Sequence, residues 1–143
     1  MYSRGKKSHS PAGSCSLQIE CLRNCEETMH RYCLTLDLKD DATAIAEYKR
    51  YHQKIWPEIR DSIYGAGIVD MQIYLLGTRL FMIMDVNEIF SLAAKAAADT
   101  ANPKVQEWEA LMGQFQQPLR DSRPGQRWVL MERIFSLQEQ NEA

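Results

Sequence analysis

Hydrophobic and polar positions change period several times along this chain, and each period predicts a secondary-structure element. Between residues 32 and 38, Tyr32, Leu34, Leu36 and Leu38 alternate with polar or smaller residues, which is typical of a strand with one buried face. The other elements follow from the same kind of pattern. They are helices over residues 42–51, 57–64, 88–98 and 103–115, and strands over residues 70–76, 80–86 and 128–137.

Local residue types set the predicted boundaries of these elements. Asp41 offers an oxygen that can cap the first helix, and Asn87 is expected to cap the third. Proline suits the first turn of a helix, so Pro57 and Pro103 are placed there. The short, glycine-containing segment 77–79 predicts a hairpin turn between two strands.

In chain order these elements read β-α-β-β-α-β, the ferredoxin-like arrangement of the α+β class. It consists of a four-stranded antiparallel sheet with helices on one face. We assign this domain to residues 30–138, a flexible N-terminal tail to residues 1–29, and a polar C-terminal end to residues 139–143. The tail is rich in Ser, Gly, Lys and Cys and has no sustained hydrophobic period.

The third and fourth predicted strands carry apolar side chains on both faces, for example Phe81 and Ile83 beside Met82 and Met84. A sheet that is apolar on both faces is usually buried on both. Because the chain has helices for one face only, we expect a second copy to cover the other face. The expected assembly is a homodimer that forms an α+β barrel, with a cavity between sheet and helices.

Composition narrows the class of protein. The 143 residues include 45% hydrophobic and 25% charged residues, as in a globular domain, and the net charge is −2. The basic excess of nucleic-acid-binding proteins is missing, so no nucleic-acid partner is expected. No apolar run reaches the roughly 20 residues that span a bilayer, and no secretory signal is recognised, so no membrane partner is expected.

The four cysteines are irregularly spaced, at Cys15, Cys21, Cys25 and Cys33, without a C-x-x-C pair. This pattern favours neither a zinc site nor a disulfide framework. Reduced thiols in a cytoplasmic protein are the better interpretation, and no metal is expected.

The segment 48–58 contains the most informative pair of side chains. Tyr48 and His52 are four residues apart in a predicted helix, so they project side by side, and the chain then turns at Trp56-Pro57. A phenol and an imidazole held in this way can bind one small polar ligand and exchange protons with it. By spacing alone, however, a lone helical histidine is more often structural than functional.

From Arg31 to Leu137 the chain resembles the L-rhamnose mutarotase family. Five motifs carry this resemblance: Glu47-Tyr48-x-x-x-His52-x-x-Ile55-Trp56-Pro57-Glu58, Ile73-Tyr74-Leu75, Leu80-Phe81-Met82, Gln106-x-Trp108-x-x-x-Met112 and Ile134-Phe135-x-Leu137. The resemblance implies a dimeric α+β barrel. It also implies a cofactor-free enzyme that interconverts the α and β anomers of a 6-deoxy-L-hexose.

The resemblance further implies roles for five residues. His52 would be the acid/base group, and the sugar would be contacted by Tyr48, Met71, Trp108 and Glu109. Two of these positions depart from the family pattern, because Met71 replaces a tyrosine and Glu109 replaces a second tryptophan. Both departures affect recognition of the sugar and leave the reaction type unchanged, which makes L-fucose a candidate beside L-rhamnose.

Two other functions are compatible with the pattern. A dimeric-barrel monooxygenase would share the architecture but would need a haem-ligating histidine or a large apolar slot. A non-catalytic sugar-binding or dimerisation module would bind the ligand without accelerating anomer exchange. Apart from these functions, the purely structural interpretation makes Trp108 a core residue and Glu109 a solvated helix position.

Overall fold

The computed structural model describes residues 29–142, so the predicted tail lies outside the described residues except for Met29. The strands are β1 (His30–Leu38), β2 (Ile68–Leu76), β3 (Arg79–Val86), β4 (Gln116–Gln117) and β5 (Val129–Leu130). The helices are α2 (Ala42–Gln53), α3 (Pro57–Gly65), α4 (Leu92–Ala101) and α5 (Pro103–Gly113), followed near the C-terminus by the 3-10 helix η1 (Gln138–Glu142). None of the helices in the described part of the chain has the length and apolar character needed to cross a bilayer.

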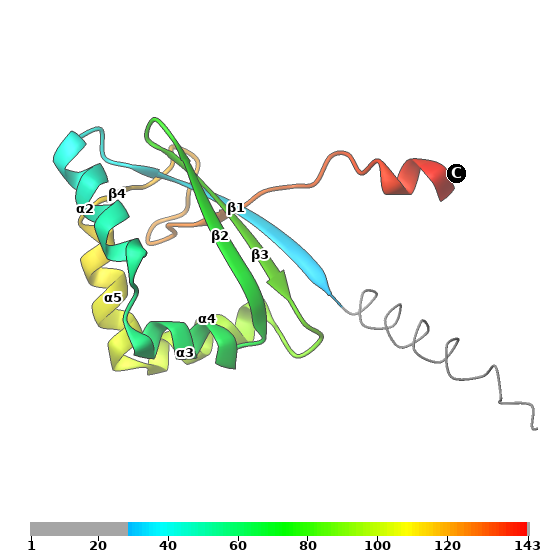
Figure 1. The fold of residues 1–143 in the computed structure, drawn as a ribbon, viewed down its shortest axis with the longest axis horizontal. Coiled ribbons are helices and arrows are strands. Elements are labelled where there is room, and N and C mark those ends of the chain that lie inside the picture. Colours follow the sequence, from blue (N-terminus) through cyan, green and yellow to red (C-terminus); the bar gives the residue numbers. More distant parts are fainter. Residues whose placement is uncertain (1–28, 143) are drawn as a thin grey trace, which may run out of the picture.

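The strands form one antiparallel sheet in the order β2-β3-β1-β4, with β5 also paired to β1. Side chains alternate between its two faces. On β3, Leu80, Met82, Met84 and Val86 are buried, whereas the residues between them are not. Figure 1 shows the four α-helices on one side of the sheet. The buried row points toward them, because Leu80 packs with residues of α2, α3 and α5. The predicted α+β, ferredoxin-like fold is therefore confirmed.

A break between α2 and α3 fixes the position of the candidate histidine. Asp41 caps α2 as predicted, and its side chain accepts a hydrogen bond from the Thr43 amide at 3.1 Å. The chain becomes extended at Lys54 and again at Trp56. At Trp56 the cause is Pro57, because the residue before a proline avoids the helical region. As a result α2 ends one residue after His52, and Pro57 starts α3.

Two clusters of buried side chains form the core. The larger cluster joins the sheet to α2, α3 and α5 and contains Leu38, Tyr48, Ile59, Leu80, Val105, Trp108 and Met112. The smaller cluster contains Ile68, Met84 and Val86. Two candidate site residues, Tyr48 and Trp108, therefore belong to the core, and their positions are fixed by packing.

The predicted start of the third helix is wrong. α4 begins at Leu92 and is capped by Ser91, whose hydroxyl accepts a hydrogen bond from the Ala94 amide at 3.3 Å. Asn87 does not cap this helix, because its side chain instead accepts a hydrogen bond from the Ile89 amide in a local turn. This turn also packs against Gly67, where a Cβ would lie only 2.5 Å from the Asn87 side-chain oxygen.

The last predicted strand is also largely wrong. Only Val129 and Leu130 pair with β1, although the Met131 amide still donates a hydrogen bond to the Cys33 carbonyl at 2.8 Å. Beyond that point residues 131–142, which we name the C-terminal arm, leave the sheet and extend away from the domain (Figure 1). A strand needs a neighbouring strand to pair with, and a single chain provides none for the arm.

Candidate functional site

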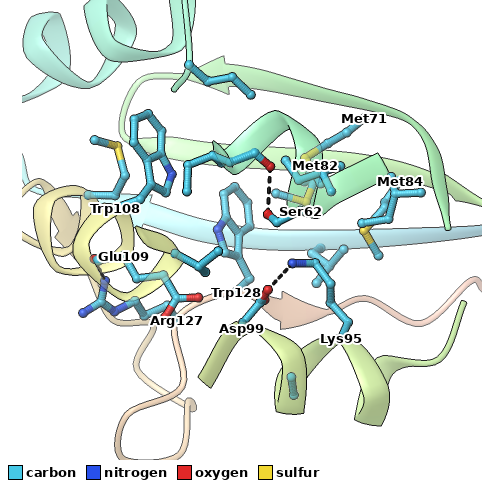
Figure 2. Close-up of a pocket in the computed structure, with 18 of the residues that line it drawn as sticks. Ser62, Met71, Met82, Met84, Lys95, Asp99, Trp108, Glu109, Arg127 and Trp128 are labelled. Carbon is cyan, nitrogen blue, oxygen red and sulfur yellow. Dashed lines mark hydrogen bonds and ion pairs between the residues drawn. The ribbon is translucent and has the colours of Figure 1, made fainter. Parts of the chain in front are cut away.

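A cavity of about 680 Å³ lies between the helices and the buried face of the sheet, which is in the usual size range of small-molecule sites. All five residues predicted for the site line it: Tyr48 and His52 from α2, Met71 from β2, and Trp108 and Glu109 from α5. Residues far apart in sequence thus meet around one space, and Figure 2 shows three of them, Met71, Trp108 and Glu109.

The imidazole of His52 is held in one orientation by its own helix. Its Nδ1 atom lies 2.8 Å from the backbone carbonyl oxygen of Tyr48. A carbonyl oxygen can only accept a hydrogen bond, so Nδ1 carries the proton in the neutral ring. Nε2 is then unprotonated and is the ring nitrogen available to a ligand. This arrangement prepares His52 to act as a base.

Burial shifts the pKa values of His52 and Tyr48 in opposite directions. Loss of solvent lowers the pKa of His52, although the hydrogen bond with the Tyr48 backbone partly opposes this effect. Burial raises the pKa of Tyr48 to about 12, and a hydrogen bond with the Gln116 side chain opposes that rise. At neutral pH the site therefore contains a neutral imidazole and a protonated phenol.

An aromatic cluster surrounds the histidine. The rings of Tyr48 and His52 are 4.3 Å apart, and the ring of Trp108 lies 5.7 Å from that of His52. Tyr51 and Trp56 both meet Trp108 edge-on, at 6.3 and 5.1 Å. Trp108 is thus both a core residue and part of the cavity wall, and it keeps water away from one side of the imidazole.

A chain of polar contacts runs from the 118–127 loop to the buried tyrosine. Arg127 donates hydrogen bonds to the backbone carbonyl of Glu109 and, at 3.5 Å, to the side-chain oxygen of Gln116. Gln116 is buried, and its side chain acts on the Tyr48 hydroxyl by opposing the rise in the pKa of that group. Gly113 leaves room for this guanidinium, because a Cβ there would overlap Nη1 of Arg127. The loop is therefore attached to α5 beside the cavity.

Several cavity residues were not identified from the sequence. They are Ser62, Lys95, Asp99, Gln116, Arg127 and Trp128. The sequence carries no signal for Lys95 and Asp99, because charged residues of an alanine-rich helix are expected to face solvent. Within residues 29–142, no three His, Cys, Asp or Glu side chains come together as metal ligands would.

The fold and the cavity define a ferredoxin-like α+β protein in which a histidine lines a cavity of small-molecule size. The sequence pattern of the family described as L-rhamnose mutarotase matches residues 31–137, which is most of the chain. The chain therefore belongs to the L-rhamnose mutarotase family.

Similar proteins are named for two different sugars. An L-fucose mutarotase of Xanthomonas campestris pv. campestris is 47% identical over 114 residues, which are 78% of this chain and 91% of that protein. An L-rhamnose mutarotase of Rhizobium johnstonii is 30% identical over 57% of this chain and 74% of its own length. The crystal structure of an L-rhamnose mutarotase from Formosa agariphila has the same fold, with a TM-score of 0.57 and 21% identity, over 76% of this chain and 98% of that one.

Proposed function

We propose that this protein interconverts the α and β anomers of a free 6-deoxy-L-hexose and that L-fucose is its preferred substrate. Family membership makes it a mutarotase, an isomerase that acts on carbohydrates. One observation supports the assignment of the proton transfer to His52. The His52 Nδ1 proton is bound to the Tyr48 carbonyl, which leaves Nε2 for the ligand in a cavity of suitable size.

The reaction requires one proton to move within the sugar. His52 Nε2 takes the proton from the anomeric hydroxyl O1, the C1–O5 bond breaks, and C1=O1 becomes the aldehyde. The electron pair of the broken bond stays on O5, which receives the proton from the imidazolium. The aldehyde then rotates about C1–C2 and the steps reverse, with attack on its opposite face. A single histidine therefore balances the proton transfer, and the Tyr48 carbonyl stabilises the imidazolium through Nδ1.

Two observations favour L-fucose as the substrate, namely the name of a similar protein and the residue type at one position of the cavity wall. The protein with 47% identity is named an L-fucose mutarotase. In this chain Glu109 lines the cavity at the position where the resemblance implies a tryptophan, and it places a carboxylate where an apolar ring would otherwise lie. A carboxylate accepts hydrogen bonds from sugar hydroxyls, which an indole ring face does not. Glu109, Tyr48, Met71 and Trp108 are the proposed contacts to the sugar.

A homodimer is part of the same proposal. The sheet face opposite the helices presents Phe81, Ile83 and Tyr74, and Leu76 at its edge is 84% exposed. The C-terminal arm adds further exposed apolar side chains, namely Ile134 at 90%, Leu137 at 72% and Phe135 at 63% exposure. A second copy would bury both surfaces, as the hydrophobic effect favours. The cytoplasmic location expected from the cysteine pattern stays a proposal.

The activity can be tested by saturation-transfer NMR on equilibrated L-fucose and L-rhamnose with catalytic amounts of protein. We expect faster exchange between the two anomeric protons than in buffer. Ligand-induced shifts without faster exchange would instead indicate a non-catalytic sugar-binding module. No effect on any 6-deoxyhexose would reject the proposed function.

A further inference from the structure

Helix α4 places its charged residues toward the interior, which is the reverse of an ordinary amphipathic helix. Lys95 and Asp99 are four residues apart and form an ion pair, and their side chains are only 18% and 20% exposed. They are the least exposed residues of α4, whereas the alanines of the helix are exposed. Both charged residues line the cavity that contains His52.

Such a placement needs an explanation, because partial burial of an ion pair removes water from both charges and does not by itself stabilise a protein. An exposed alanine face and an inward pair make sense if the pair has a ligand. Its two groups complement a diol, since a carboxylate accepts hydrogen bonds from hydroxyls and an ammonium donates to their oxygens. Hydrogen bonds to charged groups are also the stronger ones.

The pair and His52 line the cavity from two different helices, α4 and α2. In Figure 2, Trp128 stands between Trp108 on one side and Lys95 with Asp99 on the other. His52 lies on the Trp108 side, with 5.7 Å between the two rings. A pyranose with its anomeric carbon at His52 would therefore extend its opposite edge, C3 and C4, toward the pair.

Polar groups continue from the pair along the same wall. The side-chain amide of Gln106 donates hydrogen bonds to the Asp99 backbone carbonyl at 2.9 Å and to the Glu109 carboxylate at 3.4 Å. Gln106 and Glu109 also line the cavity. The cavity wall formed by α4 and α5 thus combines the polar residues Lys95, Asp99, Gln106 and Glu109 with apolar ones such as Leu92 and Val105, whereas the facing sheet wall contains Met71, Met82 and Met84 and is apolar.

We propose that Lys95 and Asp99 form a specificity subsite that reads the hydroxyl at C4 of the sugar. L-Fucose carries its C3 and C4 hydroxyls on the same face of the ring, so that both can reach one ion pair. L-Rhamnose differs from L-fucose at C2 and C4. This inference rests on the proposed function, and it explains why the cavity would prefer L-fucose.

Three sugars separate the two stereocentres. 6-Deoxy-L-glucose differs from L-fucose only at C4 and from L-rhamnose only at C2. The ratio of kcat/KM for L-fucose to that for 6-deoxy-L-glucose therefore reports recognition at C4. The ratio for 6-deoxy-L-glucose to L-rhamnose reports recognition at C2. Anomer-exchange rates for all three sugars, measured by NMR with wild-type protein and variants, give both ratios.

We expect Asp99→Asn and Lys95→Met each to lower the C4 ratio about tenfold, mainly through KM for L-fucose, and to leave the C2 ratio unchanged. Glu107→Gln is the matched control, because Glu107 pairs with Lys104 in a helix but lies outside the cavity lining. It should change neither ratio.

A charge swap separates recognition from folding. The double variant Lys95→Asp/Asp99→Lys can re-form the ion pair, so a purely structural role would be restored, whereas the reading of C4 would remain lost. Full recovery of the C4 ratio in the swap would overturn the inference, as would an unchanged ratio in both single variants. Absence of catalysis on all three sugars in the wild-type protein would instead reject the proposed function.

Discussion

Nδ1 of His52 lies 2.8 Å from the backbone carbonyl oxygen of Tyr48, the residue one helical turn before it. The side chain that would do the chemistry is therefore oriented by the backbone of its neighbour and not by another side chain. No carboxylate is needed to set the tautomer, and substitution of the Tyr48 side chain leaves the carbonyl in place. This separation makes the contributions of the two residues measurable.

Replacing His52 should abolish most of the acceleration. His52→Gln keeps a polar side chain of similar reach but cannot carry a proton, so we expect anomer exchange to slow by about 10²–10⁴-fold. Saturation-transfer NMR on L-fucose measures this directly. The control is Gln53→Ala, an exposed neighbour outside the cavity lining, which should keep wild-type rates. Equal rates in His52→Gln and wild type would show that another group moves the proton.

The rate should fall on the acidic side of neutrality. Because burial lowers the pKa of His52, the neutral ring needed for proton removal persists below the ordinary value of about 6.5. We expect kcat/KM to be level at neutral pH and to fall with an apparent pKa below 6.5. Because the pKa of Tyr48 is raised to about 12, ionisation of the phenol should cause no second change in kcat/KM near neutral pH. An acidic limb centred above 6.5 would contradict this environment for His52.

The same shift links His52 to stability. The folded-state pKa lies below the unfolded value, so the unfolded chain binds the proton first as the pH falls. His52 therefore leaves stability unchanged above about pH 6.5 and lowers it as the pH falls from there toward the folded-state pKa. Chemical denaturation of wild type and His52→Gln at several pH values should show this loss only in the wild type.

Two substitutions at Tyr48 should give different results. Tyr48→Phe removes the hydroxyl that meets Gln116 but keeps the ring against His52, so we expect a loss of about 1 kcal/mol in the free energy of unfolding and a small rate change. Tyr48→Ala empties a core position and should cost about 3–5 kcal/mol. Urea denaturation and exchange rates measure both effects. A rate loss in Tyr48→Phe as large as that of His52→Gln would make the phenol a proton-transfer group.

Local signals in the sequence were sufficient for the part of the site on α2. The spacing of Tyr48 and His52 and the break at Pro57 are properties of a few adjacent residues, and the structure reproduces them. The α4 side of the cavity could not be obtained in this way. Both Asn87 and Ser91 are good capping residues, and only the packing of the turn against Gly67 decides between them.

The prediction for the C-terminal region was wrong for a different reason. The segment 128–137 has the composition of a strand, but a strand is defined by its partner. The edge of β1 accepts only Val129 and Leu130 before the chain leaves it. Trp128 likewise enters the cavity because Arg127 is anchored to α5 through the space at Gly113, which is a tertiary contact without a sequence signature.

The proposed homodimer predicts that one charge on the open sheet face is disruptive. Ile83→Glu places a carboxylate among Phe81 and Tyr74, so association through this face should weaken strongly. Sedimentation velocity should show a dimer for wild type and a monomer for the variant. Tyr64→Glu on α3 is the control, because this exposed apolar residue lies away from that face. A monomeric wild-type protein at micromolar concentration would reject the dimer.

Position 109 should influence which sugar is preferred. Glu109→Trp restores the residue type that the family resemblance implies and removes a carboxylate from the cavity wall. The change should disturb the fold little, because Glu109 is exposed, Arg127 binds its backbone, and its side chain gives up only the long hydrogen bond from Gln106 at 3.4 Å. We expect the ratio of kcat/KM for L-fucose to that for L-rhamnose to fall about tenfold, the usual value of a lost hydrogen bond to a charged group. Glu109→Gln keeps a hydrogen-bonding side chain of equal size. Its kcat/KM ratio for the two sugars should therefore lie between those of the wild type and Glu109→Trp. If both variants keep the wild-type ratio while remaining active, Glu109 does not select the sugar, and selection must come from other residues of the cavity.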